Sequence, residues 1–250
     1  MALRNGVVVH GPTAWGAAVR LPDGVIRTAS GRVPRVGPQV TTPFVRGPVR
    51  LAEAFALLPA VKRALPEARF AFERPAVVGA LVAGGVAASA VRRAPLATGL
   101  RETLAAIASL TPAVLSLRGG ELTAYHGAEH VSIGSYERDA PAAKEHDRCG
   151  SHLVGPLLLT SALASALASR APRRLRGPAR VAGAMGALGA SVEVLGWMAR
   201  NPGTPVARAL ARPGTELQSR VSTAEPSPAQ LEVARSALEA CLAAEEAAAG

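Results

Sequence analysis

The chain has few of the residues that usually carry chemistry. Of its 250 residues only 3% are aromatic, and it contains two cysteines, five histidines and only two lysines, Lys62 and Lys144. Two cysteines do not indicate a disulfide framework. The N-terminus also lacks the order of charged, apolar and small residues that is typical of a signal peptide, so we expect the N-terminal region to stay in the cytoplasm.

Charge is scarce as well, and the positive charge is almost entirely arginine. Charged residues make up 18% of the chain and hydrophobic residues 49%, with a mean hydropathy of +0.22, which favours a membrane protein or an Ala-rich helical core. The net charge of +10 can indicate nucleic-acid binding, but the arginines lie between apolar runs and no nucleic-acid motif accompanies them. Arginines that flank apolar helices are typical of membrane proteins. We therefore expect a multi-pass protein of the cell inner (plasma) membrane, which contacts membrane lipid and binds no nucleic acid.

Four nearly uncharged stretches predict short apolar helices. The first two are shorter than the roughly 20 residues that a spanning helix prefers, whereas the last two are joined by an Arg-rich connector and are typical of a helical pair. The alternative is that all four are buried helices of a soluble bundle. If all four span the membrane with the N-terminus inside, the connector lies outside, against the usual charge bias, so the number and orientation of spans stay open. The stretches are residues 76–91, 103–117, 153–169 and 181–199.

Two smaller units are expected on either side of this mainly α membrane region. Residues 1–50 contain short strand-like runs, two of them joined by the turn signal Pro22-Asp23-Gly24, and predict a small β-rich N-terminal unit. Residues 51–212 form the helical membrane region, and residues 213–250 form a polar tail.

Within residues 51–72, apolar residues recur at helical spacing but are interrupted by prolines. We expect short helices here, cut at Pro59 and Pro66, because proline removes a helical hydrogen bond and clashes with the preceding turn.

The polar tail predicts one amphipathic helix over residues 227–248. Ser227 and Gln230 form a capping box, and Pro228 suits the first helical position. We expect this helix to dock on another surface through its apolar stripe, and that surface could belong to a protein partner. Its apolar stripe consists of Leu231, Ala234, Leu238 and Leu242.

The segment 121–152 gathers the rare residues, including four of the five histidines, both tyrosines and Cys149. In Y-H-G-A-E-H, His126 and His130 are four residues apart, so on a helix they share a face and can hold one metal ion. Glu129 lies at the edge of that face. The spacing H-x-x-E-H is the reversed zinc-peptidase motif, in which two histidines bind zinc and the glutamate is the general base.

A second group of metal-ligand types follows in E-H-D-R-C-G-S-H. It offers Cys149 and one of His146 or His152 as further ligands for a divalent metal such as zinc. Solvated loop residues that bind no metal are the alternative interpretation. Residues that could orient the ligands are Tyr125, Tyr136, Glu137 and Arg148.

One ionisable residue, Glu193, stands inside the last apolar stretch. A carboxylate there is unfavourable unless it faces a partner or a polar cavity, which makes Glu193 a functional candidate. An interface position near Trp197 is the alternative.

The two motifs Y-H-G-A-E-H and H-D-R-C-G resemble the signature of the YqhQ-like family, bacterial integral membrane proteins of unknown function described as predicted metal-dependent enzymes. The resemblance extends to G-V-V-V-H-G-P near the N-terminus, to P-F-V-R-G-P-V-R, and to R-P-G-T-E-L-Q-S-R-V-S-T near the C-terminus, and thus covers nearly the whole chain in order. It implicates Tyr125, His126, Gly127, Glu129, His130, Glu137, His146, Arg148, Cys149 and Gly150.

Some positions depart from the family pattern. Val131 stands where the family has lysine, and Asp147 where it has proline. Asn5 replaces an acidic residue and His10 an arginine. Loss of the lysine and of the acidic residue puts in doubt any ion pair at those two points. The residues of metal-ligand type are all retained.

Three kinds of function remain open from the sequence. The first is a membrane metal-dependent hydrolase, with His126, His130, His146 and Cys149 as the ligand set and Glu129 as the general base. The second is a non-catalytic membrane scaffold or assembly factor whose metal is structural, which a cysteine ligand favours. The third is thiol chemistry by Cys149, activated by His146 or Arg148.

Overall fold

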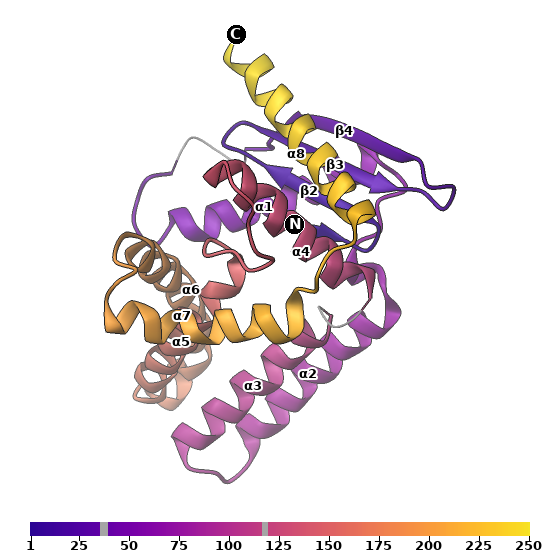
Figure 1. Cartoon of the computed structure of the whole chain (residues 1–250). Helices are drawn as coiled ribbons and strands as arrows, with labels where there is room; N and C mark the ends of the chain where they lie inside the picture. The colour runs from indigo at the N-terminus through magenta and orange to yellow at the C-terminus, as the bar shows by residue number, and fades with distance from the viewer. Residues whose placement is uncertain (36–39, 117–119) are drawn as a thin grey trace.

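The computed structural model describes residues 1–35, 40–116 and 120–250, and it places a small sheet beside two pairs of long helices (Figure 1). The sheet contains β1 (Ala2–Leu3), β2 (Gly6–His10), β3 (Ala14–Arg20) and β4 (Ile26–Arg32), antiparallel and in sequence order. The turn between β3 and β4 has Gly24 at φ 88, a conformation that favours glycine. The predicted β-hairpin is therefore confirmed.

Alternate residues of the strands face two different helical layers. On one face, Val8, Trp15 and Ala17 form a core with α1 (Arg46–Ala64). On the other face, Val7 and Ala18 pack against α4 (Glu121–Arg138) and α8 (Pro228–Ala249). The strands β2 and β3 are thus buried on both sides, and one of the covering helices carries the H-G-A-E-H motif.

The prediction that Pro59 cuts the helix in this region is wrong, because α1 runs unbroken from Arg46 to Ala64 with Pro59 inside it. Pro59 lies on the exposed side of α1, where water can satisfy the carbonyl group that loses its helical donor. Leu57 and Val61, on the opposite side, are buried against the sheet and hold the helix together across the proline.

The predicted apolar stretches fall on long helices, apart from residue 117 at the end of the second stretch, which lies outside the described residues, and Leu153, which belongs to a 3₁₀ turn. The helices form two packed pairs, α2 with α3 and α5 with α6, and the first pair extends away from the sheet (Figure 1). In the described part of the chain, three segments are long and apolar enough to cross a membrane: Pro75–Arg93, Gly150–Ser169 and Arg173–Arg200. The helices are α2 (Pro75–Arg93), α3 (Thr98–Ser116), α5 (Val154–Ser169) and α6 (Arg176–Arg200).

The outward sides of these segments are apolar. Only 17%, 28% and 22% of the three candidate spans is buried inside the protein. Water does not favour so much exposed hydrocarbon, whereas lipid does, so the surface suggests membrane association rather than a soluble bundle. Large exposed apolar side chains on these helices include Leu81, Val82, Val86, Leu163, Leu167, Val181 and Met185.

Short elements connect the helix pairs to the sheet. The 3₁₀ turn η1 (Ala71–Glu73) leads into α2, and η2 (Gly150–Leu153) leads into α5. After α6, helix α7 (Pro205–Leu217) packs against η2 and α5 and continues into the π-helical turn η4 (Gln218–Ser222). A further 3₁₀ turn, η3 (Arg173–Leu175), precedes α6.

Helix α8 forms where the sequence predicts it, with the Ser227–Gln230 capping box in place. Its buried face consists of Val233, Ala234, Ala237 and Cys241, whereas the larger leucines of the predicted stripe lie at its border. The small residues face the sheet because Gly16 of β3 lies directly against the α8 backbone. Helix α8 therefore docks on the chain's own sheet, and a protein partner for it stays a prediction.

Candidate metal centre

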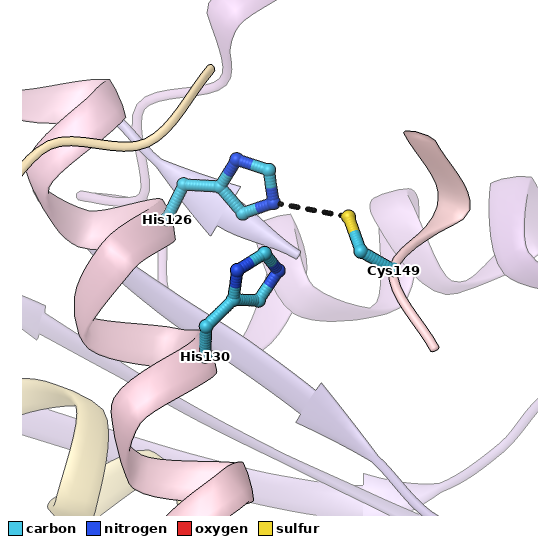
Figure 2. Close-up of side chains that lie close together, drawn as sticks. All are labelled: His126, His130 and Cys149. Carbon is cyan, nitrogen blue, oxygen red and sulfur yellow. Dashed lines mark hydrogen bonds between the residues drawn. The ribbon is translucent and has the colours of Figure 1, made fainter. Parts of the chain in front are cut away.

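Helix α4 and the segment after it bring three donor side chains together. His126 and His130 project from one face of α4 with ring centroids 4.4 Å apart, as their spacing predicts. Cys149 reaches them from the start of η2, with its Sγ 3.6 Å from Nε2 of His126 (Figure 2). One ligand atom from each of the three residues lies within 4.8 Å of the other two.

The chain reverses sharply after α4, which is how Cys149 returns to the histidines. Asp139 ends the helix in the left-handed conformation, with φ 50. The segment that follows folds back along α4, where the Ala142 backbone N–H donates to Ser135 Oγ at 3.2 Å. Gly134 leaves room for this return, because a Cβ there would press on Ala142.

Backbone carbonyl groups fix the protonation of both histidine rings. Nδ1 of His126 lies 2.8 Å from the Ser222 carbonyl, and Nδ1 of His130 lies 2.6 Å from the Lys144 carbonyl. A carbonyl can only accept, so each Nδ1 carries the proton and each neutral ring keeps its lone pair on Nε2. Histidines that bind metals are usually held in this way by a second partner.

The spacing of the donors fits one small metal ion. With bonds of about 2.0 Å to nitrogen and 2.3 Å to sulfur, two tetrahedral zinc ligands lie about 3.5 Å apart. The observed separation of 3.6 Å between Cys149 Sγ and His126 Nε2 matches this value.

The electrostatic surroundings favour the thiolate. Burial opposes ionisation of Cys149, but hydrogen bonds from His126 and His130 outweigh it and lower the pKa of the thiol to about 5. Burial also disfavours the charged form of His126, yet its contacts with Cys149 and the charge of Glu129 raise the pKa of that ring. In the absence of metal, Cys149 is therefore a thiolate at neutral pH, held against the ring of His126. The partner of the thiol is thus His126, rather than the predicted His146 or Arg148.

Glu129 lies beside the three donors and is largely buried. One carboxylate oxygen forms an ion pair with the Met1 ammonium group, and Oε2 is buried without a hydrogen-bond partner among the described residues. Burial would raise the pKa of Glu129, but the charges of Met1 and His126 prevail and lower it. The carboxylate is therefore ionised at neutral pH.

The structure does not place His146 among the grouped donors. Its Nδ1 accepts from the backbone N–H of Arg148 at 3.2 Å, and its Nε2 lies 3.2 Å from Glu137. Both ring nitrogens are therefore occupied, although the ring lies 5.7 Å from that of His130. Glu137 also accepts from Arg148 Nη1 at 3.2 Å, so these predicted supporting residues form a network at the border of the group.

His152 and Gln218 form a second network behind the group. His152 is buried, with Nε2 3.3 Å from Thr215 Oγ1 and Nδ1 3.2 Å from Gln218 Nε2. Gln218 is fully buried, and its amide also contacts the backbone of His146 and the hydroxyl of Ser151. Sequence reasoning missed Gln218, and its only signal was a place in the T-E-L-Q-S-R-V-S-T stretch that resembles the family.

Gly127, inside the H-G-A-E-H motif, permits the close approach of the extended segment after η4. A Cβ at Gly127 would collide with the Ala224 carbonyl oxygen. The Ala224 N–H also donates to the Thr123 carbonyl at 3.0 Å. This approach places the Ser222 carbonyl against His126. The glycine of the motif is thus part of the histidine's support.

Two other predicted supporting residues lie away from the donors. Tyr125 is buried in the core between α4, the sheet and α8. Glu193 pairs with Arg46 of α1, whose Nε lies 2.8 Å from Oε1, and it also accepts from the Phe44 N–H at 3.2 Å. Glu193 therefore has the partner that a carboxylate in an apolar helix needs, and it fastens α6 to α1.

The three donors open onto a cavity of about 640 Å³. Its other polar residues are His10, Glu129, Glu137, His146, Arg148 and Ser151. The lining also contains large apolar residues, which sequence reasoning did not connect with the site. They are Phe70, Phe72, Leu122 and Ile133.

Fold and site together define a helical protein with apolar helices suited to a membrane, a small covering sheet and a His/His/Cys group beside a cavity. A family model described as a protein of unknown function, DUF1385, matches residues 120–244, which is half of the chain. The chain belongs to this family.

A curated relative agrees with this assignment. The uncharacterized protein YqhQ of Bacillus subtilis (strain 168) is 36% identical over 118 residues, which are 44% of this chain and 37% of that protein. The matched part thus spans little more than a third of the relative's length. No solved structure matches the chain.

Proposed function

We propose that the chain is a membrane metal-dependent hydrolase in which His126, His130 and Cys149 hold one divalent, zinc-like ion. The observation that carries the proposal is the convergence of three donor atoms, two of them on rings whose protonation is fixed by backbone carbonyls. Among the described residues the group has three members, and hydrolytic zinc sites commonly use three protein ligands and one open position. The adjacent cavity supplies space for a substrate at that position.

When bound, such an ion would polarise a substrate oxygen and lower the pKa of a water molecule toward neutrality. The chain's own residues would do the rest. Glu129 is ionised and lines the same cavity, so it would accept the proton of the attacking water. The Ser222 and Lys144 carbonyls would keep the histidine lone pairs directed at the ligand position.

Replacing Glu129 by glutamine tests the proposal. The Glu129→Gln variant should keep its metal and lose turnover by at least about 100-fold, because a positioned general base contributes that much or more. Turnover would be screened on ester, amide and phosphoester substrates in membranes or detergent, with metal content measured on the same samples. Exposed Glu225, which lies away from the cavity, provides the matched control Glu225→Gln.

The competing function is a scaffold or assembly factor with a structural metal. It is favoured by the cysteine among the donors and by their position, which would let an ion staple η2 to α4. A scaffold predicts that Glu129→Gln changes neither metal content nor any cellular phenotype. Turnover that is equal in Glu129→Gln and the parent would contradict the hydrolase.

A further inference from the structure

The cavity beside the donor group lies where two candidate membrane spans begin. Phe72, in its lining, is three residues before Pro75, where the first span starts. Cys149 directly precedes Gly150, where the second span starts. If α2 and α5 cross a membrane from these starting points, the donor group lies near the level of the membrane surface.

The cavity lining combines polar and large apolar side chains. Leu122 and Ile133 lie on the same face of α4 as His126 and His130, and Phe70 and Phe72 come from the segment that leads into α2. Phe70 is buried and stacks on Phe72 with centroids 5.1 Å apart. Phe72 itself is 47% exposed, an unfavourable arrangement for a large ring in water.

The apolar lining continues onto the surface of α2. Helix α2 packs against η1, and Val78 and Leu81 in its first turns are exposed. An apolar chain could therefore pass from the lipid beside α2 over Phe72 into the cavity without crossing water. A small water-soluble substrate would make no use of these side chains.

We propose that the substrate is a bilayer amphiphile, with an ester or phosphoester head that reaches the donor group and a long apolar chain that lies against Phe72. This inference deepens the proposed hydrolase and rests on it for the reaction, but not for binding. Residues of η1 and α4 would contact the apolar chain of the substrate, and the histidines and Cys149 would contact its head.

Photolabelling of the full chain in lipid nanodiscs tests the proposal. The probe is a long-chain phosphatidic acid with a photoreactive group on the chain, and mass spectrometry locates the labelled peptides. We expect labelling of the segments around Phe72 and Leu122, and at least about tenfold less in Phe72→Ala, because the loss of a buried aromatic contact weakens binding by that order. Phe55 of α1 is 61% exposed and does not line the cavity, so Phe55→Ala is the matched control and should label like the parent.

A short-chain, water-soluble counterpart of the probe shows whether binding depends on the apolar chain or on the head alone. We expect this compound not to compete with the long-chain probe for labelling. Equal labelling in the Phe72→Ala and Phe55→Ala variants, or full competition by the short-chain compound, would overturn the inference. Metal content is measured on the same samples: labelling without metal contradicts only the hydrolase, and metal without labelling contradicts only the amphiphile.

Discussion

Cys149 and His126 define the chemistry of the site at the scale of single residues. Their atoms lie at the separation of two metal ligands, and the pKa of about 5 makes the metal-free Cys149 a thiolate at neutral pH. A metal ion and an alkylating reagent compete for the same sulfur lone pair, so metal binding and thiol reactivity should exclude each other. The other cysteine, Cys241, is buried, and burial raises the pKa of its thiol.

The lowered pKa of Cys149 predicts an unusual pH profile for alkylation of the metal-free protein. Because the pKa is about 5, the thiolate persists from about pH 8 down to about pH 6, and the alkylation rate should halve only as the pH falls through about 5. The measurement is the rate of iodoacetamide labelling after chelation. The Cys149→Ser variant should not label, and added zinc should protect the parent protein. A rate that already falls tenfold between pH 8 and pH 7 would contradict the assignment.

At the scale of elements, the π-helical turn η4 is the support of the site. The Ser222 carbonyl at its end holds His126, and Gln218 at its start holds the backbone of His146 and the hydroxyl of Ser151. π-Helical turns are rare and often occur at functional sites. One short element thus fixes the first histidine on α4 and the segment that carries Cys149.

Gln218→Leu is therefore expected to weaken both stability and the site. The substitution leaves the His146 N–H and the His152 ring without their buried partner, at about 1–3 kcal/mol for each unsatisfied group. We expect the free energy of unfolding to fall by about 3 kcal/mol and metal affinity to weaken by at least about tenfold. Thermal unfolding and metal titration in detergent measure the two effects. The neighbouring exposed Ser219→Ala should change neither, and an unchanged Gln218→Leu variant would refute the role of η4.

The sequence predicted the elements of this region better than their contacts. The spacing of His126 and His130 was enough to place them on one helical face, and rare residue types were enough to select Cys149. His146 has the same residue type as the ligands, yet its nitrogens are occupied by Arg148 and Glu137. The carbonyls of Lys144 and Ser222 left no sequence signal at all, because every residue has a carbonyl and only the fold decides which one faces a histidine.

Local sequence rules also failed where tertiary packing intervened. Pro59 did not cut α1, because buried Leu57 and Val61 hold the helix against the sheet. The amphipathic pattern predicted a docking helix without naming its surface, and α8 shares a core with β2 and β3. A pattern of apolar residues reports that a helix has a buried face, and it does not identify the surface that covers that face.

At the scale of the whole molecule, the site limits how the chain can cross a membrane. The sheet precedes α2 and α4 follows α3, yet α4 packs against β1 and β2. The start of α2 and the end of α3 therefore lie on the same side of the molecule, so these two helices either both cross the membrane or both stay out of it. At the far end, Glu102 of α3 lies 3.6 Å from Arg92 of α2 and 4.0 Å from Arg180 of α6, which puts the two helix connectors at one level.

This arrangement predicts the sidedness of labelling by a membrane-impermeant maleimide. In a Cys149→Ser background, Leu96→Cys and Arg173→Cys on the two connectors should react from one face of the membrane. Thr28→Cys on exposed β4 should react from the opposite face. The measurement compares sealed vesicles of opposite orientation. Labelling of Leu96→Cys and Thr28→Cys from the same face would exclude the crossing described above.

The central claim is that His126, His130 and Cys149 bind one metal ion, and elemental analysis of the purified protein tests it most directly. The parent should contain about one divalent metal ion per chain, and the double variant His126→Ala, His130→Ala should contain none. Exposed Glu225, which does not line the cavity, supplies the control variant Glu225→Gln, which should retain the metal. Equal metal content in the parent and the double variant, or no metal in either, would contradict the claim.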